Sequence, residues 1–163
     1  SEKRGATIDN PVEIRDMLPT MLDAAGDTEQ RAKVDGASLL SLIADRRAKW
    51  RDAIDLEHDV CYEESNHWTG MTDGTWKYVY HAHNGEDQLF NLKDDPFELH
   101  DLARDSGYTR RKREWRGRLI EHLSERGEPF VVKGDLGVQP KSFLYSPNWP
   151  GCKCHGKERK VAN

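Results

Sequence analysis

Two short stretches bring histidine together with residue types that bind ligands. EESNHWTG places His67 and Trp68 where a loop enters an expected strand, and LEHD places Glu57 and His58 on a neighbouring strand. Imidazole and indole groups on a loop held by a rigid scaffold are typical of binding sites, because they combine hydrogen bonding with an apolar face. The structural alternative is that His67 makes local hydrogen bonds at a strand edge, and that Glu57 and His58 satisfy buried backbone groups.

A cysteine cluster toward the C-terminal end is a candidate metal site. CKCHG offers Cys152, Cys154 and His155 as soft ligands. Structural zinc takes four ligands, usually from C-x-x-C-like knuckles, and only the distant Cys61 could complete this set. The three cysteines are also too few and too unevenly spaced for a disulfide framework. The pattern therefore does not favour a zinc site.

Motifs that build an active site by themselves are absent from the sequence. It contains no G-x-S-x-G nucleophile elbow, no G-x-x-x-x-G-K-[ST] phosphate loop, no G-x-G-x-x-G and no H-E-x-x-H. No stretch therefore forms a recognisable active site alone.

Composition limits the class of protein. The 163 residues suffice for one domain with a real core, but 33% are charged and only 36% are apolar. This balance indicates long solvated segments or a missing partner surface. The formal net charge of -4 does not favour nucleic acid as a partner. No apolar run approaches the roughly 18 to 20 residues that span a bilayer, and the first residues do not read as a leader, so we expect no membrane partner. The compartment is not indicated.

The N-terminal quarter is expected to be a strand followed by a short helix. Val12 and Ile14 alternate like a strand, Asp16 is a plausible N-cap, and Gly26 is a C-terminal stop, so we expect a helix over residues 17–25. Its apolar residues fall at helical spacing and need an apolar surface to meet. They are Met17, Leu18, Met21 and Leu22. A short buried helical turn is expected at residues 39–43.

From Ile54 onward the hydrophobic period changes to two, which is typical of strands. The expected strands are Ile54–His58, Trp68–Thr72, Trp76–His81 and Gln88–Leu92, with the Asn84-Gly85 pair in a hairpin turn. Residues 108–127 then carry one apolar stripe of Tyr108, Trp115, Leu119 and Leu123. The predicted fold is α+β: an antiparallel sheet of about four strands covered by one long C-terminal helix.

A succession of five segments carries a family resemblance. PVEIRDMLPTMLDAAG, VDGASLLSLI, LEHDVCYEESNHWTGMTDGTWKYVY, DQLFNLKDDPFELHDLA and LIEHLSERGEPFV occur in this order, within about residues 5–140. Together they resemble the C-terminal part of a formylglycine-dependent sulfatase of the arylsulfatase type. The resemblance implies a large alkaline-phosphatase-like α/β domain followed by a small subdomain of antiparallel sheet and one long helix. This sequence is similar to the last edge of the first and to nearly all of the second.

The catalytic groups of that family have no match here. The resemblance implies a Cys or Ser in a C/S-x-P-S-R motif, oxidised to formylglycine, beside a Ca²⁺ held by Asp and Asn side chains. No cysteine of this sequence stands in such a motif, and Asp94 and Asp95 precede Pro96 in a turn instead of ending a core strand. We therefore expect no cofactor in this chain, and Ca²⁺ and formylglycine in a missing N-terminal domain.

The resemblance also suggests a role for the histidines and their neighbours. Sulfate esters are anionic with polar leaving groups, and the family's loops in this region can approach the mouth of the catalytic cleft. The candidate substrate-binding residues at this rim are His67, Trp68, Glu57 and His58. Lys77 could direct its cation at sulfate, but a lysine stem lying over an aromatic neighbour is the commoner arrangement.

Two functions are compatible with these observations. The first is a sulfatase C-terminal subdomain that supports hydrolysis of a sulfate ester as scaffold and cleft rim. It divides into the edge of the missing domain (1–50), the subdomain (51–127) and a surface-wrapping tail (128–163). Its expected partners are the N-terminal sulfatase domain and a sulfated small molecule or saccharide. The alternative is a stand-alone polyanion-binding module that uses the basic helix 110–118, RRKREWRGR.

Overall fold

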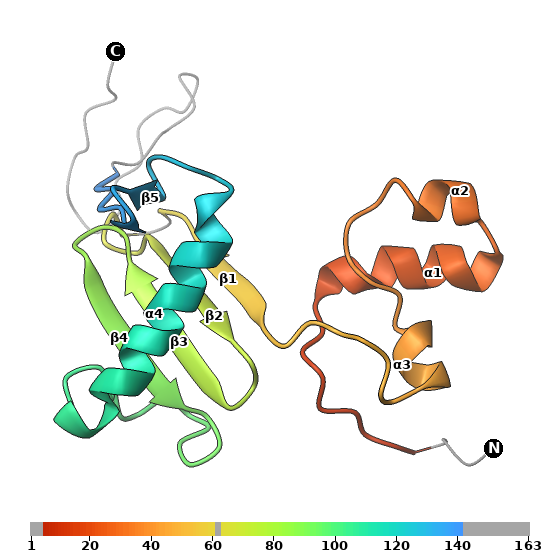
Figure 1. Ribbon diagram of the computed structural model, residues 1–163, viewed down its shortest axis with the longest axis horizontal. Helices are drawn as coiled ribbons and strands as arrows, with labels where there is room; N and C mark the ends of the chain where they lie inside the picture. Colours follow the sequence, from red (N-terminus) through yellow and green to blue (C-terminus); the bar gives the residue numbers. More distant parts are fainter. Residues whose placement is uncertain (1–4, 61–62, 142–163) are drawn as a thin grey trace.

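The computed structural model describes residues 5–60 and 63–141, which form a helical part and a sheet part joined near residues 49–53 (Figure 1). The helical part contains η1 (Ile14–Asp16), α1 (Met17–Ala25), α2 (Thr28–Arg31) and α3 (Leu40–Ala44). The sheet part contains β1 (Ile54–His58), β2 (Trp68–Thr72), β3 (Trp76–His81), β4 (Glu86–Asn91), η2 (Ser106–Tyr108), α4 (Thr109–Ser124), β5 (Val131–Val132) and β6 (Asp135–Leu136). The predicted α+β class is confirmed.

The helical part begins with a 3₁₀ turn that runs directly into α1. Asp16 is the N-cap residue of α1, and Gly26 ends the helix in the left-handed conformation, so the predicted helix at 17–25 is confirmed. The brief strand expected at Val12 and Ile14 is wrong. The side chains of Glu13 and Asp16 bond reciprocally to each other's backbone N–H groups and close η1 instead.

Apolar side chains of the helical part lie exposed to an unusual degree. Ile14 is 86% and Met21 60% exposed, and Leu18 and Ile43 are also more than half exposed. Leu42 is buried, so only one side of α3 packs inward. The described residues therefore do not supply the apolar surface that these side chains need.

The four long strands form one antiparallel sheet in the order β1-β2-β3-β4. Their register pairs His58 with Trp68, Trp68 with His81, and His81 with Glu86. Three predicted strands have the bounds expected from the sequence, while β4 begins two residues earlier than predicted. Gly85 takes a positive φ of 82° in the turn before β4, a conformation that glycine adopts without strain.

Helix α4 crosses one face of the sheet and closes the core (Figure 1). Trp115, Leu119 and Leu123 are buried on the helix, at the predicted spacing of a single stripe. They pack in one cluster with Tyr78 and Leu89 of the sheet. Alternation along β3, together with direct pairing across the sheet, therefore places Tyr78, Met71 of β2 and Leu89 of β4 on the face under α4.

A small hairpin of β5 and β6 follows α4 within the segment predicted to be a surface tail. Lys133 and Gly134 have φ values of 53° and 82°, as both central residues of a tight primed turn require. Leu136 of β6 is buried in the core, and the Tyr80 hydroxyl donates a hydrogen bond to its carbonyl at 3.1 Å. This part of the tail thus contributes to the core; the predicted division at residues 50 and 127 stays a prediction.

Candidate functional site

The face of the sheet away from α4, here called the far face, carries one row of polar and aromatic residues. Cross-strand pairing places His58, Trp68, His81 and Glu86 opposite one another, one from each strand. His81 stands three residues after Tyr78 on β3 and therefore faces away from α4. Directly paired residues of an antiparallel sheet share a face, so all four lie on the far face. Strands lie about 4.8 Å apart, so this row extends over roughly 14 Å. We call these four residues the far-face row.

The His58 ring stacks on the Trp68 indole within this row. Their centroids are 5.8 Å apart and the ring planes differ by 15°. His58 Nδ1 lies 2.9 Å from the backbone oxygen of Asn66. Because a carbonyl only accepts, Nδ1 carries the proton, and Nε2 of the neutral ring is left as an acceptor.

His67 lies at the end of the sheet under the C-terminal segment. Its side chain is 1% exposed, and Nδ1 is 3.0 Å from the backbone oxygen of Gln139. Its backbone oxygen accepts a bond from His83 N–H at 3.3 Å. These contacts give His67 a structural partner, so direct contact with a substrate would require residue 139 to move. A role in substrate binding stays a prediction for His67.

Glu57 points to the other side of the sheet from His58. Both guanidinium Nη atoms of Arg126 reach its carboxylate, at 2.9 and 3.1 Å. The Arg126 guanidinium also lies 3.5 Å from the centre of the Phe130 ring. The pair therefore fastens β1 to the segment after α4, and the structure brings Trp68 together with His58 but not with Glu57.

Lys77 on the far face also has an internal partner. Its Nζ lies 2.9 and 2.7 Å from the two carboxylate oxygens of Glu98. An ammonium group held by a bidentate carboxylate is not free to bind sulfate without losing that pair. Lys77 therefore closes the turn after β4 onto the sheet.

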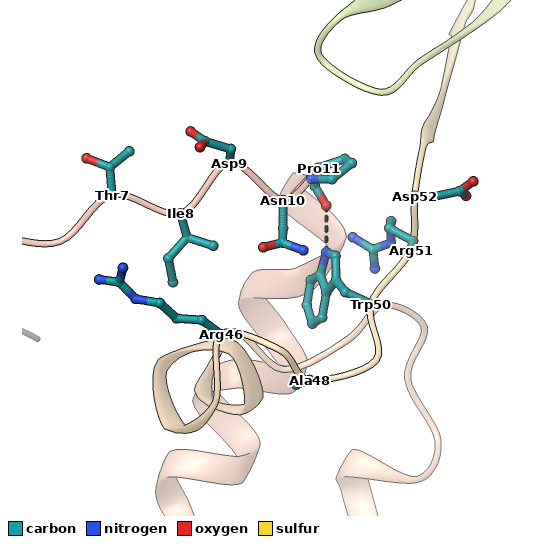
Figure 2. A pocket seen from close by; sticks show the side chains of 10 residues that line it. All are labelled: Thr7, Ile8, Asp9, Asn10, Pro11, Arg46, Ala48, Trp50, Arg51 and Asp52. Carbon is teal, nitrogen blue, oxygen red and sulfur yellow. Dashed lines mark hydrogen bonds between the residues drawn. The ribbon is translucent and has the colours of Figure 1, made fainter.

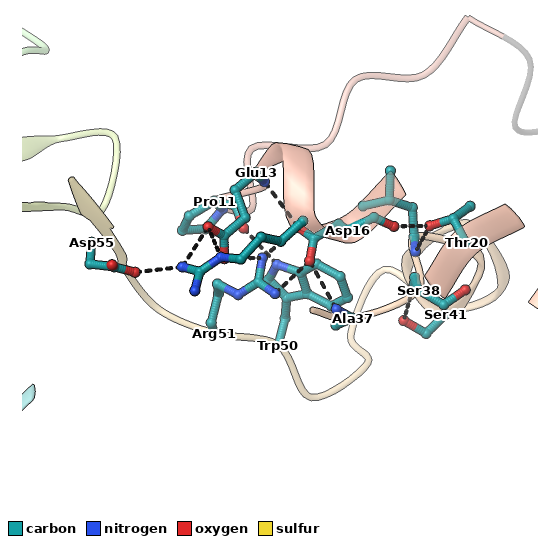
Figure 3. Close-up of polar contacts among 12 residues, drawn as sticks. Pro11, Glu13, Asp16, Thr20, Ala37, Ser38, Ser41, Trp50, Arg51 and Asp55 are labelled. Carbon is teal, nitrogen blue, oxygen red and sulfur yellow. Dashed lines mark hydrogen bonds and ion pairs between the residues drawn. The ribbon is translucent and has the colours of Figure 1, made fainter. Parts of the chain in front are cut away.

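A buried carboxylate organises the helical part (Figure 3). Asp16 is fully buried and accepts hydrogen bonds from Arg51 Nη1 and Nη2 at 2.5 and 2.6 Å. The backbone N–H groups of Ala37 and Glu13 complete its shell at 2.9 and 3.0 Å. The bonds from Arg51 hold the pKa of Asp16 at about 2, below the ordinary 3.8. One carboxylate thus joins three segments of the helical part.

A cleft of about 590 Å³ opens beside this network (Figure 2). Trp50 forms one wall, and its indole N–H donates to the Pro11 carbonyl at 2.7 Å. Arg46 reaches across the cleft toward Ile8, and Asn10 lines it as well. The cleft lies between the N-terminal segment, residues 7–11, and the segment of residues 46–52 that links α3 to β1.

The described residues do not fit the Ca²⁺ ion that the resemblance implies. Within residues 5–60 and 63–141, no three His, Cys, Asp or Glu side chains come together as ligands. Asp94 accepts a bond from Asn91 Nδ2 at 2.6 Å, and Asp95 accepts one from His100 N–H at 2.8 Å, so both stabilise their turn. The candidate zinc ligands Cys61, Cys152, Cys154 and His155 lie outside the described residues. No described helix is long and apolar enough to span a bilayer.

The far-face row also contains residues that the sequence pattern did not single out. His81 and Glu86 join Trp68 only through the register of β2, β3 and β4. The sequence identifies Asp16 only as a helix cap, because its partner Arg51 lies 35 residues away. The two turns between β2 and β4 were the signal that could have placed His81 beside Trp68.

Comparison with known sequences connects this arrangement to sulfatases. The family described as N-sulphoglucosamine sulphohydrolase, C-terminal, matches residues 2–125. An arylsulfatase of Clostridium perfringens is 37% identical over 129 residues, covering 79% of this chain and 26% of the relative. A Delta 4,5-hexuronate-2-O-sulfatase of Bacteroides thetaiotaomicron is 25% identical over 137 residues, covering 83% and 28%. The chain therefore spans about a quarter of the length of these curated relatives.

Solved structures share the fold. One is an enzyme in complex with its substrate D-glucosamine-2-N,6-O-disulfate, with a TM-score of 0.60, 24% identity, and coverage of 70% of this chain and 24% of that chain. A 2-O GAG sulfatase gives a TM-score of 0.55 at 26% identity, covering 69% and 25%. A phosphonate monoester hydrolase of Agrobacterium radiobacter gives 0.51 at 20% identity, covering 76% and 28%.

Proposed function

Because the chain belongs to the N-sulphoglucosamine sulphohydrolase C-terminal family, and so to the C-terminal part of the sulfatases, we propose that it serves an enzyme hydrolysing a sulfate ester. The products are an alcohol and inorganic sulfate. The observation that carries the proposal is the family match over residues 2–125, joined to a sheet and long helix of the same fold as solved sulfatases. In this function the chain is the scaffold and substrate-facing rim, and it does not contain the nucleophile.

We assign the reacting groups to an N-terminal catalytic domain. The two relatives are long enough to contain such a domain, because this chain covers only 26% and 28% of them. That domain would hold the formylglycine and the Ca²⁺ that the resemblance implies, and these would supply the nucleophile and a cationic centre for the sulfate. The described residues contribute position instead: His58 and Trp68 offer a rim surface, and His67 is held beneath it by the Gln139 carbonyl. A polar residue at the rim of a cleft can orient the substrate relative to reacting groups that belong to another domain.

The exposed apolar side chains of the helical part support such a partner. Ile14 of η1 and Leu18 and Met21 of α1 are all more than half exposed. Burial of apolar surface is the main drive for packing one domain on another, at about 25 cal/mol per Å². The catalytic domain is therefore proposed to cover α1 and α3.

The alternative of a polyanion-binding helix receives less support from the side chains of α4. Most of its basic residues already have acidic or aromatic partners. Arg111 pairs with Glu114, Lys112 and Arg116 with Asp87, and Arg118 with Asp52. Among the described residues only Arg110 and Arg113 of α4 are cations with no such partner, and two exposed charges make a weak polyanion surface.

The purified chain by itself is expected to show no turnover of a chromogenic aryl sulfate. A chimera in which it replaces the matching C-terminal quarter of the Clostridium perfringens arylsulfatase is expected to hydrolyse that substrate. The reason is that the reacting groups lie in the catalytic domain, while the subdomain supplies its support and rim. Sulfate release is the measurement for both proteins, and cooperative thermal unfolding shows that the chimera is folded.

Trp68→Ala in the chimera sharpens this test. Loss of one positioned contact is expected to lower kcat/KM by an amount that corresponds to about 1 to 3 kcal/mol of transition-state stabilisation. The melting temperature should change little. Arg113→Ala on exposed α4 is the matched control and should leave both quantities unaltered. Turnover by the isolated chain, or a folded chimera without activity, would contradict the proposed function.

A charge placed on the exposed apolar surface should lower the free energy of unfolding only when the catalytic domain is present. Met21→Lys in the isolated chain is expected to change the free energy of unfolding by less than about 0.5 kcal/mol, because the side chain is already in water. In the chimera the same change should lower stability by about 2 kcal/mol or more, since a charge would be buried at the interface. Equal effects of Met21→Lys in the two proteins, measured by chemical unfolding, would count against docking at α1.

A further inference from the structure

We propose that the exposed side of α4 is a docking surface for a second copy of this chain, whose own α4 packs antiparallel across Gly117. The surface, here called the outer α4 line, follows the helix at spacings of three and four residues. Its members are all exposed: Arg110, Arg113, Gly117, Glu121 and Glu125. The buried stripe of Trp115, Leu119 and Leu123 points to the opposite side, toward the sheet. The inference concerns neither the substrate nor the catalytic domain, so it is independent of the proposed function.

The first support is that the charges on this line have no partner within the described part of the chain. Arg110 and Arg113 at one end, and Glu121 and Glu125 at the other, form no ion pair among the described residues. On the flanks of the helix, by contrast, Arg116 is paired with an acidic side chain at 2.6 Å. Like charges three or four positions apart on a helix repel each other, so each end of the line is unfavourable in the single chain.

The second support is the order of the charges along the helix. The dipole of a helix favours acidic residues at its N-terminal end and basic residues at its C-terminal end. The first turn of α4 contains no acidic residue and carries Arg110, while Glu121 and Glu125 stand at the C-terminal end. This order opposes the dipole. A second helix in the antiparallel direction would bring the opposite charge to both ends.

The third support is that the line is complementary to itself. Arg113 precedes Gly117 by four residues and Glu121 follows it by four, so a two-fold axis at Gly117 places Arg113 opposite Glu121 of the second copy. Arg110, seven residues before Gly117, then lies beside Glu125 of the second copy, eight residues after it. Each of these contacts occurs twice in a two-fold dimer. A polyanion would pair with the arginines alone and leave both glutamates uncompensated.

The fourth support is the glycine at the centre of the line. A glycine inside an exposed helix is less stable than alanine would be. A Cβ built on Gly117 meets nothing within 4 Å, so packing within the described chain does not require the glycine. The absence of a side chain lets another helix backbone approach closely at this position. Gly117 thus stands where the two helices would cross.

The contact is small, so the dimer is expected to be weak. Helix α4 has 16 residues, and one helix pair covers less than the roughly 800 Å² per partner of a standard interface. Surface ion pairs are individually weak, so we expect a dissociation constant of about 0.1 to 1 mM at low salt. Salt screens exposed charges, so about 0.5 M salt should weaken the dimer by about tenfold.

Sedimentation equilibrium of the complete chain tests the charge pairing. Arg113→Glu alone and Glu121→Arg alone should each raise the dissociation constant at least about tenfold, because each change replaces two attractive contacts by two repulsive ones. An equimolar mixture of the two variants should dimerise with a dissociation constant within about threefold of the natural value, because each variant supplies the charge that the other lacks. Lys93→Glu, the same reversal at an exposed residue after β4, is the matched control and should change nothing.

Gly117→Leu tests the crossing point. The leucine side chain should abolish dimerisation, while the melting temperature stays the same or rises because leucine favours helix more than glycine does. A chain that remains monomeric at millimolar concentration in low salt would overturn the inference, as would a mixture of the two charge variants that fails to dimerise. Binding to dextran sulfate that Arg113→Glu abolishes, in a chain that never dimerises, would also overturn it and make a polyanion the occupant.

Discussion

Asp16→Ala is expected to lower the free energy of unfolding by about 3 kcal/mol or more, because it removes one side of a buried ion pair. Asp16 is fully buried, and the variant would leave Arg51 and two backbone N–H groups without their acceptor. Glu13, at 3.6 Å from Arg51, compensates only part of this loss. Urea unfolding followed by circular dichroism measures the change, and helical signal should be lost first.

The pH dependence distinguishes an electrostatic role of Asp16 from simple packing. Its folded pKa of about 2 is below the ordinary 3.8, so its contribution is present above about pH 4 and is lost as the pH falls toward 2. The shift corresponds to about 2 kcal/mol. The stability difference between the natural protein and Asp16→Asn should therefore narrow over this interval. A difference that stays constant from pH 6 to pH 2 would show that the charge is not responsible.

Asp23→Ala is the matched control for these measurements. Asp23 lies on the same helix, is about one third exposed, and is 3.7 Å from Arg31. Exposed pairs of this kind contribute about 0 to 1 kcal/mol, so the control should unfold almost as the natural protein does. If Asp23→Ala lowered the free energy of unfolding as much as Asp16→Ala, the effect of Asp16→Ala could not be assigned to its buried ion pair.

Trp115→Ala is expected to lower the free energy of unfolding by about 3 to 5 kcal/mol, through the cavity that a missing indole leaves. Trp115 is 1% exposed and packs in the core cluster with Tyr78 and Leu89 of the sheet. The Arg118 guanidinium lies 4.3 Å from the ring centre and would also lose its contact. Thermal or urea unfolding of the purified chain checks the value.

Trp115→Phe separates volume from hydrogen bonding in this core. The indole Nε1 is buried and has no hydrogen-bond partner among the described residues, so replacing it removes no bond. The phenylalanine variant should therefore retain most of the stability that alanine loses, and Arg113→Ala at the exposed side of α4 should change little. A phenylalanine variant as unstable as the alanine variant would show that the core requires the full volume of the indole.

Much of the sheet could be read from the sequence because its signals are local. Alternation of apolar residues and the glycine-containing turns depend on neighbours a few positions away, and they gave the bounds of β1, β2 and β3. The strand expected at Val12 failed because Glu13 and Asp16 form a capping box, which outweighs a two-residue alternation. The hairpin of β5 and β6 was missed because strands of two residues carry too little pattern.

The sequence pattern identified only part of the candidate site. His58 and Trp68 stood out by residue type, and the structure stacks them. Glu57, next in sequence to His58, faces Arg126 on the other side of the sheet. Residue type could not make that distinction, because side chains alternate between faces and the face is fixed only when α4 covers one of them.

The sequence by itself determined the family, the class of fold and the local elements, since each depends on short-range pattern or on the order of motifs. Tertiary structure alone decided which residues meet. Gln139 covers His67 across 72 positions, Arg51 reaches Asp16 across 35, and His81 joins Trp68 through strand register. Such contacts follow from the packing of distant segments, where burial and hydrogen-bond satisfaction of the whole domain select one arrangement among the many that local preferences allow.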